Sequence, residues 1–392
     1  MGRHRPAGDH HGMTTPTTSF DHIVSPTPVD RDRVVDAMRA GSILVVVLWH
    51  WSMSVLRWSD DGSLSMPNPI DSIPGGWLAT WILQVMPLFF VVGGYANLTS
   101  LHHRSRSLGE FARERARRLI LPLLPMVTVW AAADAVGLLL RGDDHRSVLE
   151  WGFVVFVPLW FIGVFAAVSM LAPITARLHR QAPFATLAAM AGGVITVDAL
   201  RFATGAEVIG WINVLLVFTF AHQLGYLWRD GRLTRSAPLL AIGSVVTLAL
   251  MTGFGPYPGS MVATESTALS NMNPTTAPIA AVAVLQWSLT MLAAPTLRRV
   301  LARAAVWKAV VIANVGAMTI FSWHMTALVL FLGLWSSLGL DLLTEPTGAW
   351  WLGRPIWVVG PGLVLTAIVA MGRRLAPRWI GIPVIAAATE RP

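Results

Sequence analysis

Ten apolar segments dominate this sequence, and each is close to the length that crosses a lipid bilayer. An α-helix rises about 1.5 Å per residue, so about 20 residues span roughly 30 Å of hydrocarbon. Helices are favoured there because they satisfy their own backbone hydrogen bonds. We therefore predict an all-α polytopic membrane protein with about ten transmembrane helices. The predicted segments are residues 35–57, 76–100, 118–140, 151–175, 184–203, 208–228, 237–254, 276–297, 308–337 and 355–373.

The composition excludes several other classes of protein. Charged residues make up 13% of the chain against 54% hydrophobic residues, and the mean hydropathy is +0.58, so a water-soluble globule is excluded. A net charge of +8 would also suit a nucleic-acid partner, but the arginines cluster in short connections between apolar segments, so we expect no nucleic acid. Cysteine is absent, which excludes disulfides, a cysteine nucleophile and thiolate metal sites. We expect no metal.

The ends of the chain differ from the apolar middle. Residues 1–30 are polar and lack the apolar core of a signal peptide, so we predict a disordered cytoplasmic tail. A metal site at the scattered histidines His4, His10 and His11 is disfavoured against a solvated tail. The predicted transmembrane domain covers residues 31–380, and residues 381–392 form a short C-terminal tail.

The arginine distribution predicts the topology. With both termini in the cytoplasm, all but five of the 29 basic residues lie on the cytoplasmic side, as the positive-inside rule requires. We therefore predict a multi-pass protein of the cell (plasma) membrane. The ninth segment exceeds the length of one span, so we expect it to be tilted or broken near Gly316. The five outer basic residues are Arg57, Arg141, Arg146, Arg201 and Arg354.

Arg39 and His50 stand eleven residues apart in the first apolar segment. On a helix, eleven steps of about 100° return to nearly the same face, about 16 Å further along. A cation at the membrane interface would then lie below a deep imidazole, which suits a long anionic ligand threaded along the helix. Two plainer interpretations stay open: His50 may bond a neighbouring helix, and Arg39 may only anchor the topology. Asp36 is expected to orient Arg39 through an i,i+3 pair.

Five sequence blocks in order resemble the membrane acyltransferase-3 family, the multi-pass acyl-CoA-dependent O-acyltransferases. The first is the Arg39 to His50 spacing, and the others follow along residues 31 to 373. In the arginine-rich block, which we expect to be a loop before the third segment, several pairs are similar to the paired arginines of the family. The other blocks are MPLFFVVGGYANL (86–98), FARERARRLILPLLP (111–125), PLWFIGVFAAVSMLAP (158–173) and FSWHMTALVL (321–330).

The resemblance implies acyl-CoA as co-substrate, with acetyl-CoA expected. Attack of a hydroxyl on a thioester needs a base near neutral pKa, and His50 is the candidate catalytic residue. The phosphates of CoA need guanidinium groups near the cytoplasmic side. The candidates for this cofactor site are Arg39, Arg113, Arg115, Arg117 and Arg118.

The acceptor site is predicted from other polar residues. His324 is expected at the depth of His50, where it either contacts the acceptor side of the site or bonds a neighbouring helix. Trp160 is expected to pack near the site. In the outer loop 255–278, Ser270, Asn271 and Asn273 are candidates for binding sugar hydroxyls. Most tryptophans, among them Trp58, Trp77, Trp350 and Trp351, are expected to be interfacial anchors.

The sequence thus predicts an integral membrane O-acyltransferase. It would move an acyl group, acetyl by expectation, from cytoplasmic acyl-CoA to a hydroxyl of an extracytoplasmic glycan, glycolipid or glycosylated natural product, in contact with membrane lipids. The alternative is a ten-helix transporter or flippase for a lipid or sugar, with His50 and Asp134 relaying protons. A catalytically silent protein with this fold is a third hypothesis.

Overall fold

A computed structural model describes residues 32–375, apart from residues 104–107, 266 and 268. Within these residues, ten helical stretches are long and apolar enough to cross a membrane, which confirms the predicted fold class. The predicted tails, residues 1–30 and 381–392, lie outside the described residues. The ten stretches are Arg33–Ser52, Trp77–His102, Gly109–Arg141, Phe153–Gln181, Pro183–Thr204, Glu207–Arg229, Thr234–Phe254, Ala277–Leu301, Ala304–Ser337 and Gly348–Arg374.

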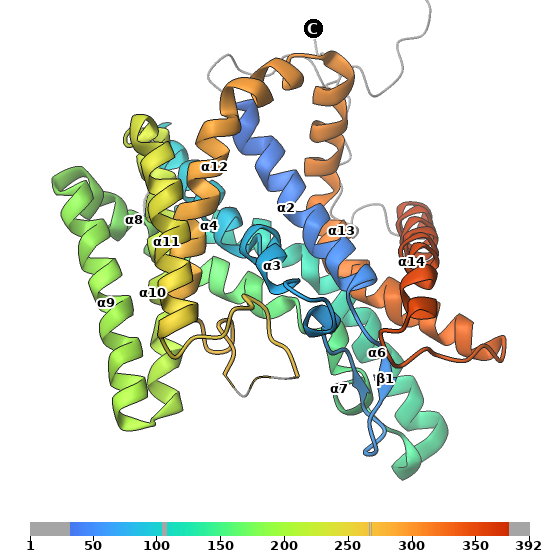
Figure 1. Ribbon diagram of the computed structural model, residues 1–392. Helices are drawn as coiled ribbons and strands as arrows, with labels where there is room; N and C mark the ends of the chain where they lie inside the picture. Colours follow the sequence, from blue (N-terminus) through green and yellow to red (C-terminus); the bar gives the residue numbers. More distant parts are fainter. Residues whose placement is uncertain (1–31, 104–107, 266, 268, 376–392) are drawn as a thin grey trace, which may run out of the picture.

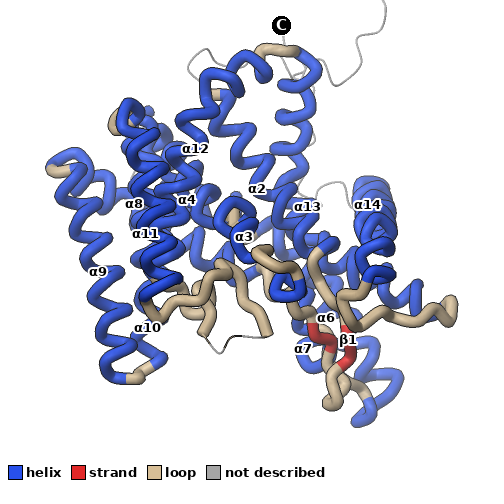
Figure 2. The backbone as a smooth tube through the Cα atoms, in the orientation of Figure 1, coloured by secondary structure: helices blue, strands red, loops and turns tan. Residues whose placement is uncertain are grey.

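Helices make up most of the described chain, and the long connections gather at one end of them (Figures 1 and 2). The short elements are α3 (Trp77–Leu83), α7 (Val148–Trp151), the hairpin β1 (Arg57–Trp58) and β2 (Leu64–Ser65), and the 3-10 turns η1 (Pro69–Ser72), η2 (Leu121–Leu123), η3 (Gly142–Asp144), η4 (Phe153–Val155) and η5 (Thr234–Ser236). The long helices are α2 (Arg33–Ser52), α4 (Met86–His103), α5 (Leu108–Leu119), α6 (Leu124–Arg141), α8 (Leu159–Gln181), α9 (Pro183–Thr204), α10 (Glu207–Arg229), α11 (Ala237–Phe254), α12 (Ala277–Leu301), α13 (Ala304–Ser337) and α14 (Gly348–Leu375).

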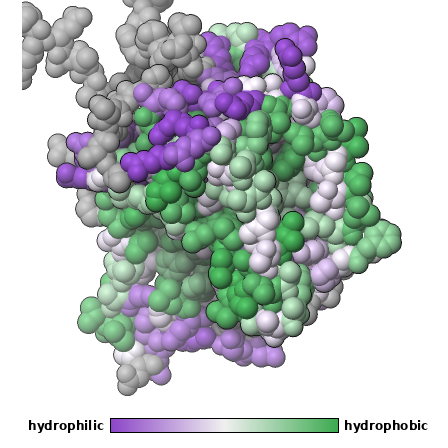
Figure 3. All heavy atoms as spheres, turned by 90° about the vertical axis from the view of Figure 1, so that its left-hand side faces the viewer, coloured by the Kyte–Doolittle hydropathy of each residue, from purple (hydrophilic) through white to green (hydrophobic). Residues whose placement is uncertain are grey.

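The surface has the pattern of a membrane protein. Figure 3 shows a hydrophobic belt between two hydrophilic ends. Basic side chains meet at one of these ends, where Arg33 donates to the carbonyl of Leu301 at 2.9 Å and Arg298 pairs with Asp32 at 3.5 Å. The start of α2 therefore lies beside the end of α12. The belt and the ten apolar helices identify a multi-pass membrane protein.

The second predicted segment is broken into α3 and α4 around Gln84 and Val85. Pro87 lies in the first turn of α4, where its missing N–H does no harm, but it cannot continue α3. The buried side chain of Gln286 on α12 repairs the break. It accepts from the backbone N–H of Leu88 at 3.2 Å and donates to the carbonyl of Gln84 at 2.9 Å. A broken helix is tolerated in a membrane when neighbours satisfy the freed backbone groups in this way.

The third predicted segment begins later than expected, and the arginine-rich block before it is a helix rather than a loop. The block forms α5, and a 3-10 turn at Leu121–Leu123 separates it from α6. Pro122 and Pro125 explain the separation, because proline has no N–H to donate to the preceding turn and fits best in the first turn of a helix. The ninth segment, by contrast, is one helix of 34 residues. Of the two expectations for this segment, the break near Gly316 is contradicted and the tilt stays a prediction, while Figure 1 shows that α13 bends along its length.

Two glycines bring α4 and α10 into close contact. A Cβ atom on Gly94 would collide with the carbonyl oxygen of His222, and one on Gly225 would collide with that of Val91. Small residues at a crossing let helix backbones approach this closely. Phe90 on α4 stacks on Phe218 of α10, with ring centroids 4.2 Å apart.

A second contact joins α2 to α13, and α14 packs against both helices (Figure 1). The indole nitrogen of buried Trp51 donates to the carbonyl of His324 at 3.0 Å. This bond fixes the height of α2 against α13. It places His50, the residue before Trp51, beside the side chain of His324.

Candidate functional site

His50 and His324 form the centre of the site. The Nδ1 atom of His50 lies 3.0 Å from the Nε2 atom of His324, and the two rings stack with centroids 5.2 Å apart. His324 is fully buried, whereas His50 is partly exposed. The structure therefore confirms that the two histidines share one depth, although they lie 274 residues apart in the sequence.

The hydrogen bonds determine which nitrogen of each ring carries the proton. The Nδ1 atom of His324 lies 2.7 Å from the carbonyl oxygen of Phe321, which can only accept, so Nδ1 is the donor. In a neutral ring the Nε2 atom of His324 is then an acceptor. The Nδ1–H group of His50 donates to it, which leaves the Nε2 atom of His50 with a lone pair. A chain of two bonds thus prepares His50 to accept a proton.

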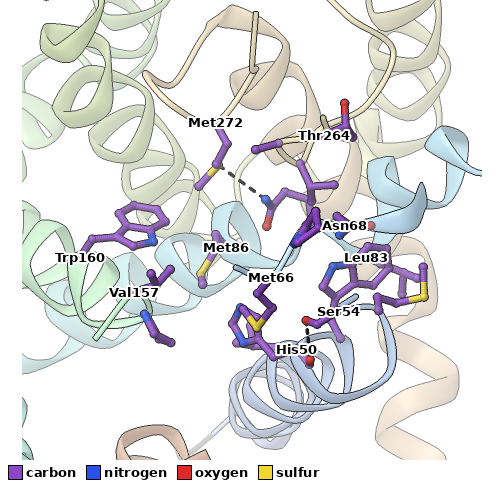
Figure 4. A pocket seen from close by; sticks show the side chains of 18 of the residues that line it. His50, Ser54, Met66, Asn68, Leu83, Met86, Val157, Trp160, Thr264 and Met272 are labelled. Carbon is purple, nitrogen blue, oxygen red and sulfur yellow. Dashed lines mark hydrogen bonds between the residues drawn. The ribbon is translucent and has the colours of Figure 1, made fainter. Parts of the chain in front are cut away.

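A cavity of about 360 Å³ adjoins His50, and Figure 4 shows the side chains around it. Its wall is mostly apolar and comes from five parts of the chain: the end of α2, the connection after it, the break between α3 and α4, the start of α8, and the loop before α12. This volume admits a small organic group or a sugar ring. The lining residues are Val46, Trp49, His50, Met53, Ser54, Met66, Pro67, Asn68, Leu83, Gln84, Met86, Val157, Pro158, Trp160, Val262, Ala263, Thr264, Glu265 and Met272.

Of the predicted acceptor residues, the cavity brings only Trp160 together with His50. His324 lies behind His50, and Ser270, Asn271 and Asn273 are not among the lining residues. The loop before α12 contributes Thr264 and Glu265 instead.

Asn271 has a clear structural role. It is fully buried, its amide donates to the carbonyls of Pro258 at 2.7 Å and Ser260 at 2.8 Å, and its Oδ1 accepts from Thr276 at 2.7 Å. Since its hydrogen bonds hold the loop together, no polar atom of Asn271 is left to face a ligand.

The two neighbouring candidates have different surroundings. The hydroxyl of Ser270 accepts from the backbone N–H groups of Met272 and Asn273, at 3.0 and 3.3 Å, and the Asn273 side chain is exposed. Because the side-chain amide of Asn271 is bonded inside the loop, the prediction that it binds the acceptor is wrong. That Ser270 and Asn273 bind the acceptor stays a prediction.

The loop is anchored at its start by Tyr257. The phenol donates to the carboxylate of Asp198 on α9 at 2.9 Å, and the same carboxylate oxygen accepts from the backbone N–H of Ala277 at 2.8 Å. Burial and the neighbouring Asp198 raise the pKa of Tyr257 above its usual range. The phenol therefore stays protonated and remains a donor. Both ends of the loop are tied to one carboxylate.

Arg39 lies on α2 toward the basic end and contacts α13. Its Nε atom donates to the side chain of Asn314 at 2.6 Å, and it pairs with Asp36 at 3.1 Å, as the i,i+3 spacing predicted. About a third of the Arg39 side chain is exposed. The cavity does not reach Arg39, because the α2 residues that line it begin at Val46.

The arginines of α5 divide between two faces. Arg113, Arg117 and Arg118 are exposed and line an open groove of about 520 Å³ together with Glu110 and Glu114. Arg118 pairs with Glu114. Arg115 lies on another face, over the buried ring of Phe111 at 5.1 Å. This split explains why the spacing alone did not single out one pair of arginines.

The sequence did not reveal the contribution of the connection between α2 and α3. This connection forms the hairpin of β1 and β2, and it lines the cavity with Met66, Pro67 and Asn68. Arg57 of the hairpin pairs with Glu265 at 3.0 Å and so joins it to the loop before α12. In the sequence, the only indication of this contact was that Arg57 and Glu265 carry opposite charges in two predicted outer loops.

The fold and the site together define a multi-pass membrane protein in which His50, backed by His324, lies at the wall of a cavity beside the end of α2. Within the described residues no group of three or more metal-binding side chains occurs. The acyltransferase-3 family, described as an acyltransferase domain, matches residues 32–373. The chain belongs to this family and is an acyltransferase of the membrane. No curated protein and no solved structure matches the chain significantly.

Proposed function

We propose that this protein is an O-acyltransferase that takes an acyl group, acetyl by expectation, from acyl-CoA and transfers it to a hydroxyl of a glycan, glycolipid or glycosylated natural product. The observation that carries the proposal is the lone pair on the Nε2 atom of His50 beside a cavity of about 360 Å³. Membership of the acyltransferase family supports it.

In the proposed reaction, His50 is the general base. The acceptor hydroxyl gives its proton to the Nε2 atom of His50 while its oxygen attacks the carbonyl carbon of the thioester. The tetrahedral intermediate collapses with cleavage of the C–S bond. The resulting imidazolium returns the proton to the leaving thiolate, so the products are the O-acyl ester and free CoA. His324 acts as a positioning residue, because it holds His50 in the reactive tautomer.

The donor is proposed to enter from the basic end of α2. Arg39, about a third of whose side chain is exposed, would bind a CoA phosphate there, and the exposed arginines of α5 are further candidates. Between Arg39 and Val46 the pantetheine arm has to pass along about two helical turns, about 10 Å, before it enters the cavity. A bound donor would widen this passage. The acceptor is proposed to enter from the end where the long connections gather.

Release of CoA tests the proposal directly. The chain has no cysteine, so a thiol reagent detects free CoA without a background from the protein. We expect the full-length protein in nanodiscs to release CoA from acetyl-CoA when an extract of cell-surface glycans and lipids is added, and mass spectrometry to find the matching acetylated product.

His102→Ala is a matched control, because this exposed histidine bonds only the carbonyl of Leu98 among the described residues. It should leave the release of CoA unchanged. Movement of a lipid or sugar across sealed vesicles with no release of CoA would support the transporter alternative and contradict the proposal. If the protein shows neither acyl transfer nor transport, the hypothesis of a catalytically silent protein remains.

A further inference from the structure

Arg354, near the start of α14, lies between aromatic rings close to His50. Its guanidinium stacks over Trp350 at 3.7 Å from the ring centroid and lies 5.6 Å from that of Trp357. Trp350 is 1% exposed, so the prediction that it is an interfacial anchor was wrong. It packs under the arginine instead. Stacking uses the face of a guanidinium and leaves the N–H groups at its edge available for hydrogen bonds.

Only part of the donor capacity of Arg354 is used within the described residues. Its Nε atom donates to the carbonyl of Trp350 at 3.1 Å, and one terminal nitrogen donates to the carbonyl of Ser54 at 3.3 Å. A guanidinium has five N–H groups, so others remain for a ligand. No ion pair in the described part of the chain involves Arg354, although Asp341 lines the same small cavity. A half-buried cation that no carboxylate of the described residues pairs with favours an anionic ligand.

The cavity beside Arg354 is close to the cavity of His50. It measures about 80 Å³, and Ser54 lines both cavities. The hydroxyl of Ser54 donates to the carbonyl of His50 at 2.6 Å, so a single helical turn separates the arginine contact from the proposed base. A space of this size admits a group of a few atoms, such as a carboxylate or phosphate, but not a sugar ring.

The position of Arg354 indicates which substrate carries the anion. Arg39, His50 and Ser54 follow one another along the chain, and Arg354 contacts Ser54. Arg354 and Arg39 therefore lie on opposite sides of His50. If the CoA phosphates bind at Arg39, about 16 Å from His50, they cannot also reach Arg354 when the thioester lies at His50. The anion therefore belongs to the acceptor.

We propose that Arg354, supported by Trp350 and Trp357, binds a carboxylate or phosphate group of the acceptor and so places the acceptor hydroxyl at His50. This inference rests on the proposed O-acyltransferase function and names its substrate class: an anionic acceptor. The sugar or other body of the acceptor would occupy the larger cavity, with its anionic group in the smaller one.

The test uses the full-length protein in nanodiscs of neutral phosphatidylcholine with radiolabelled acetyl-CoA. Cell-surface glycans and lipids are separated into neutral and anionic fractions on an anion-exchange resin and offered in turn. We expect the label in the anionic fraction. Arg354→Gln should raise the apparent KM for that fraction about tenfold or more while the KM for acetyl-CoA stays unchanged, since one charge-assisted contact is lost. Arg354→Lys keeps the charge, so its apparent KM for the anionic fraction should lie between those of the wild type and Arg354→Gln.

Arg141→Gln is the control, because Arg141 is another arginine of the predicted outer side but is exposed and lines neither cavity. It should behave as the wild type. Label confined to the neutral fraction, or an unchanged KM in Arg354→Gln, would overturn the inference while the proposed function stands. Label in neither fraction would overturn both.

A final arm separates the acceptor from a lipid headgroup as the source of the anion. Replacing part of the phosphatidylcholine with phosphatidylglycerol should not change the rate with the anionic fraction. An acceleration by phosphatidylglycerol that Arg354→Gln abolishes would assign Arg354 to lipid binding and contradict the inference.

Discussion

Two helix crossings in this protein each contain a histidine, and they differ in what surrounds it. At the contact of α4 and α10, His222 is fully enclosed. Its Nε2 atom lies 2.9 Å from the amide of Asn97, and its Nδ1 atom has no partner among the described residues. At the contact of α2 and α13, His50 is only partly buried and faces a cavity. A histidine in a membrane helix therefore becomes a candidate base only where a substrate can reach it.

Glycine explains the difference in packing. Gly94 and Gly225 let the backbones of α4 and α10 touch, which leaves no space beside His222. A Cβ atom on Gly41, the glycine of α2, would meet no heavy atom within 4 Å. The contact of α2 and α13 is instead made by larger side chains, His50 and Trp51, and these leave room for a cavity on one side. The first crossing serves stability and the second serves the proposed chemistry.

The largest expected effect is that of His50→Ala. It removes the proposed base, so we expect the rate of acyl transfer to fall about 10²- to 10⁴-fold without loss of folded protein. His222→Ala should act in the opposite way. It leaves the amide of Asn97 with one partner fewer and lowers the free energy of unfolding by about 1–3 kcal/mol, while the folded fraction keeps its activity. CoA release and thermal melting measure the two effects. Full activity in His50→Ala would assign His50 to packing.

Arg39→Ala tests the role of the other end of the α2 and α13 contact, where the donor is proposed to bind. Loss of a proposed phosphate contact weakens the ground state and the transition state alike, so the apparent KM for acetyl-CoA should rise about 10- to 100-fold with kcat little changed. Steady-state kinetics separate the two constants. A collapse of kcat at constant KM would place Arg39 at the reacting centre and contradict a donor threaded along α2.

His324→Ala should have a smaller effect than His50→Ala. Without the Nε2 atom of His324 as hydrogen-bond acceptor, His50 loses one hydrogen bond worth about 1 kcal/mol and populates both tautomers. The kcat should therefore fall about fivefold to tenfold. His324→Gln offers a carbonyl oxygen to the Nδ1–H group of His50 and should recover part of the rate. No recovery, with both variants equally folded, would argue against the positioning role.

Gly225→Ala should leave the chemistry unchanged. The added methyl group collides with the backbone of α4, and overpacking of this kind costs about 1–3 kcal/mol of stability. The melting temperature should fall while the KM for acetyl-CoA of the folded protein stays at the wild-type value. Altered donor kinetics without a lower melting temperature would show that the two crossings are coupled rather than independent.

Much of the fold was predictable because the bilayer imposes a local rule on the sequence. All ten apolar segments are helical, and the spacing of Arg39 and Asp36 predicted their ion pair correctly. The shared depth of His50 and His324 also followed from helix geometry. The bilayer rule does not fix where a helix breaks, so the division of the second segment, which depends on Gln286 from a distant helix, was missed.

The rest of the site was not predictable because it depends on contacts between distant loops. Nothing in the spacing of Ser54 and Arg354 shows that they touch across 300 residues. Asn271 looked like a free polar side chain in a loop, but its partners, Pro258 and Ser260, are known only once the loop is folded. Trp350 was expected at the interface because composition says where tryptophans are frequent and not which of them is buried.

The most direct test of the central claim is a cryo-EM structure of the full-length protein with a non-hydrolysable acetyl-CoA analogue. We predict that the acyl carbonyl lies in the cavity beside the Nε2 atom of His50, with the CoA phosphates at the Arg39 end of α2 and the His50–His324 hydrogen bond intact. An acyl group outside this cavity, or a His50 ring whose Nε2 atom is bonded to the protein instead of facing the acyl group, would contradict the account.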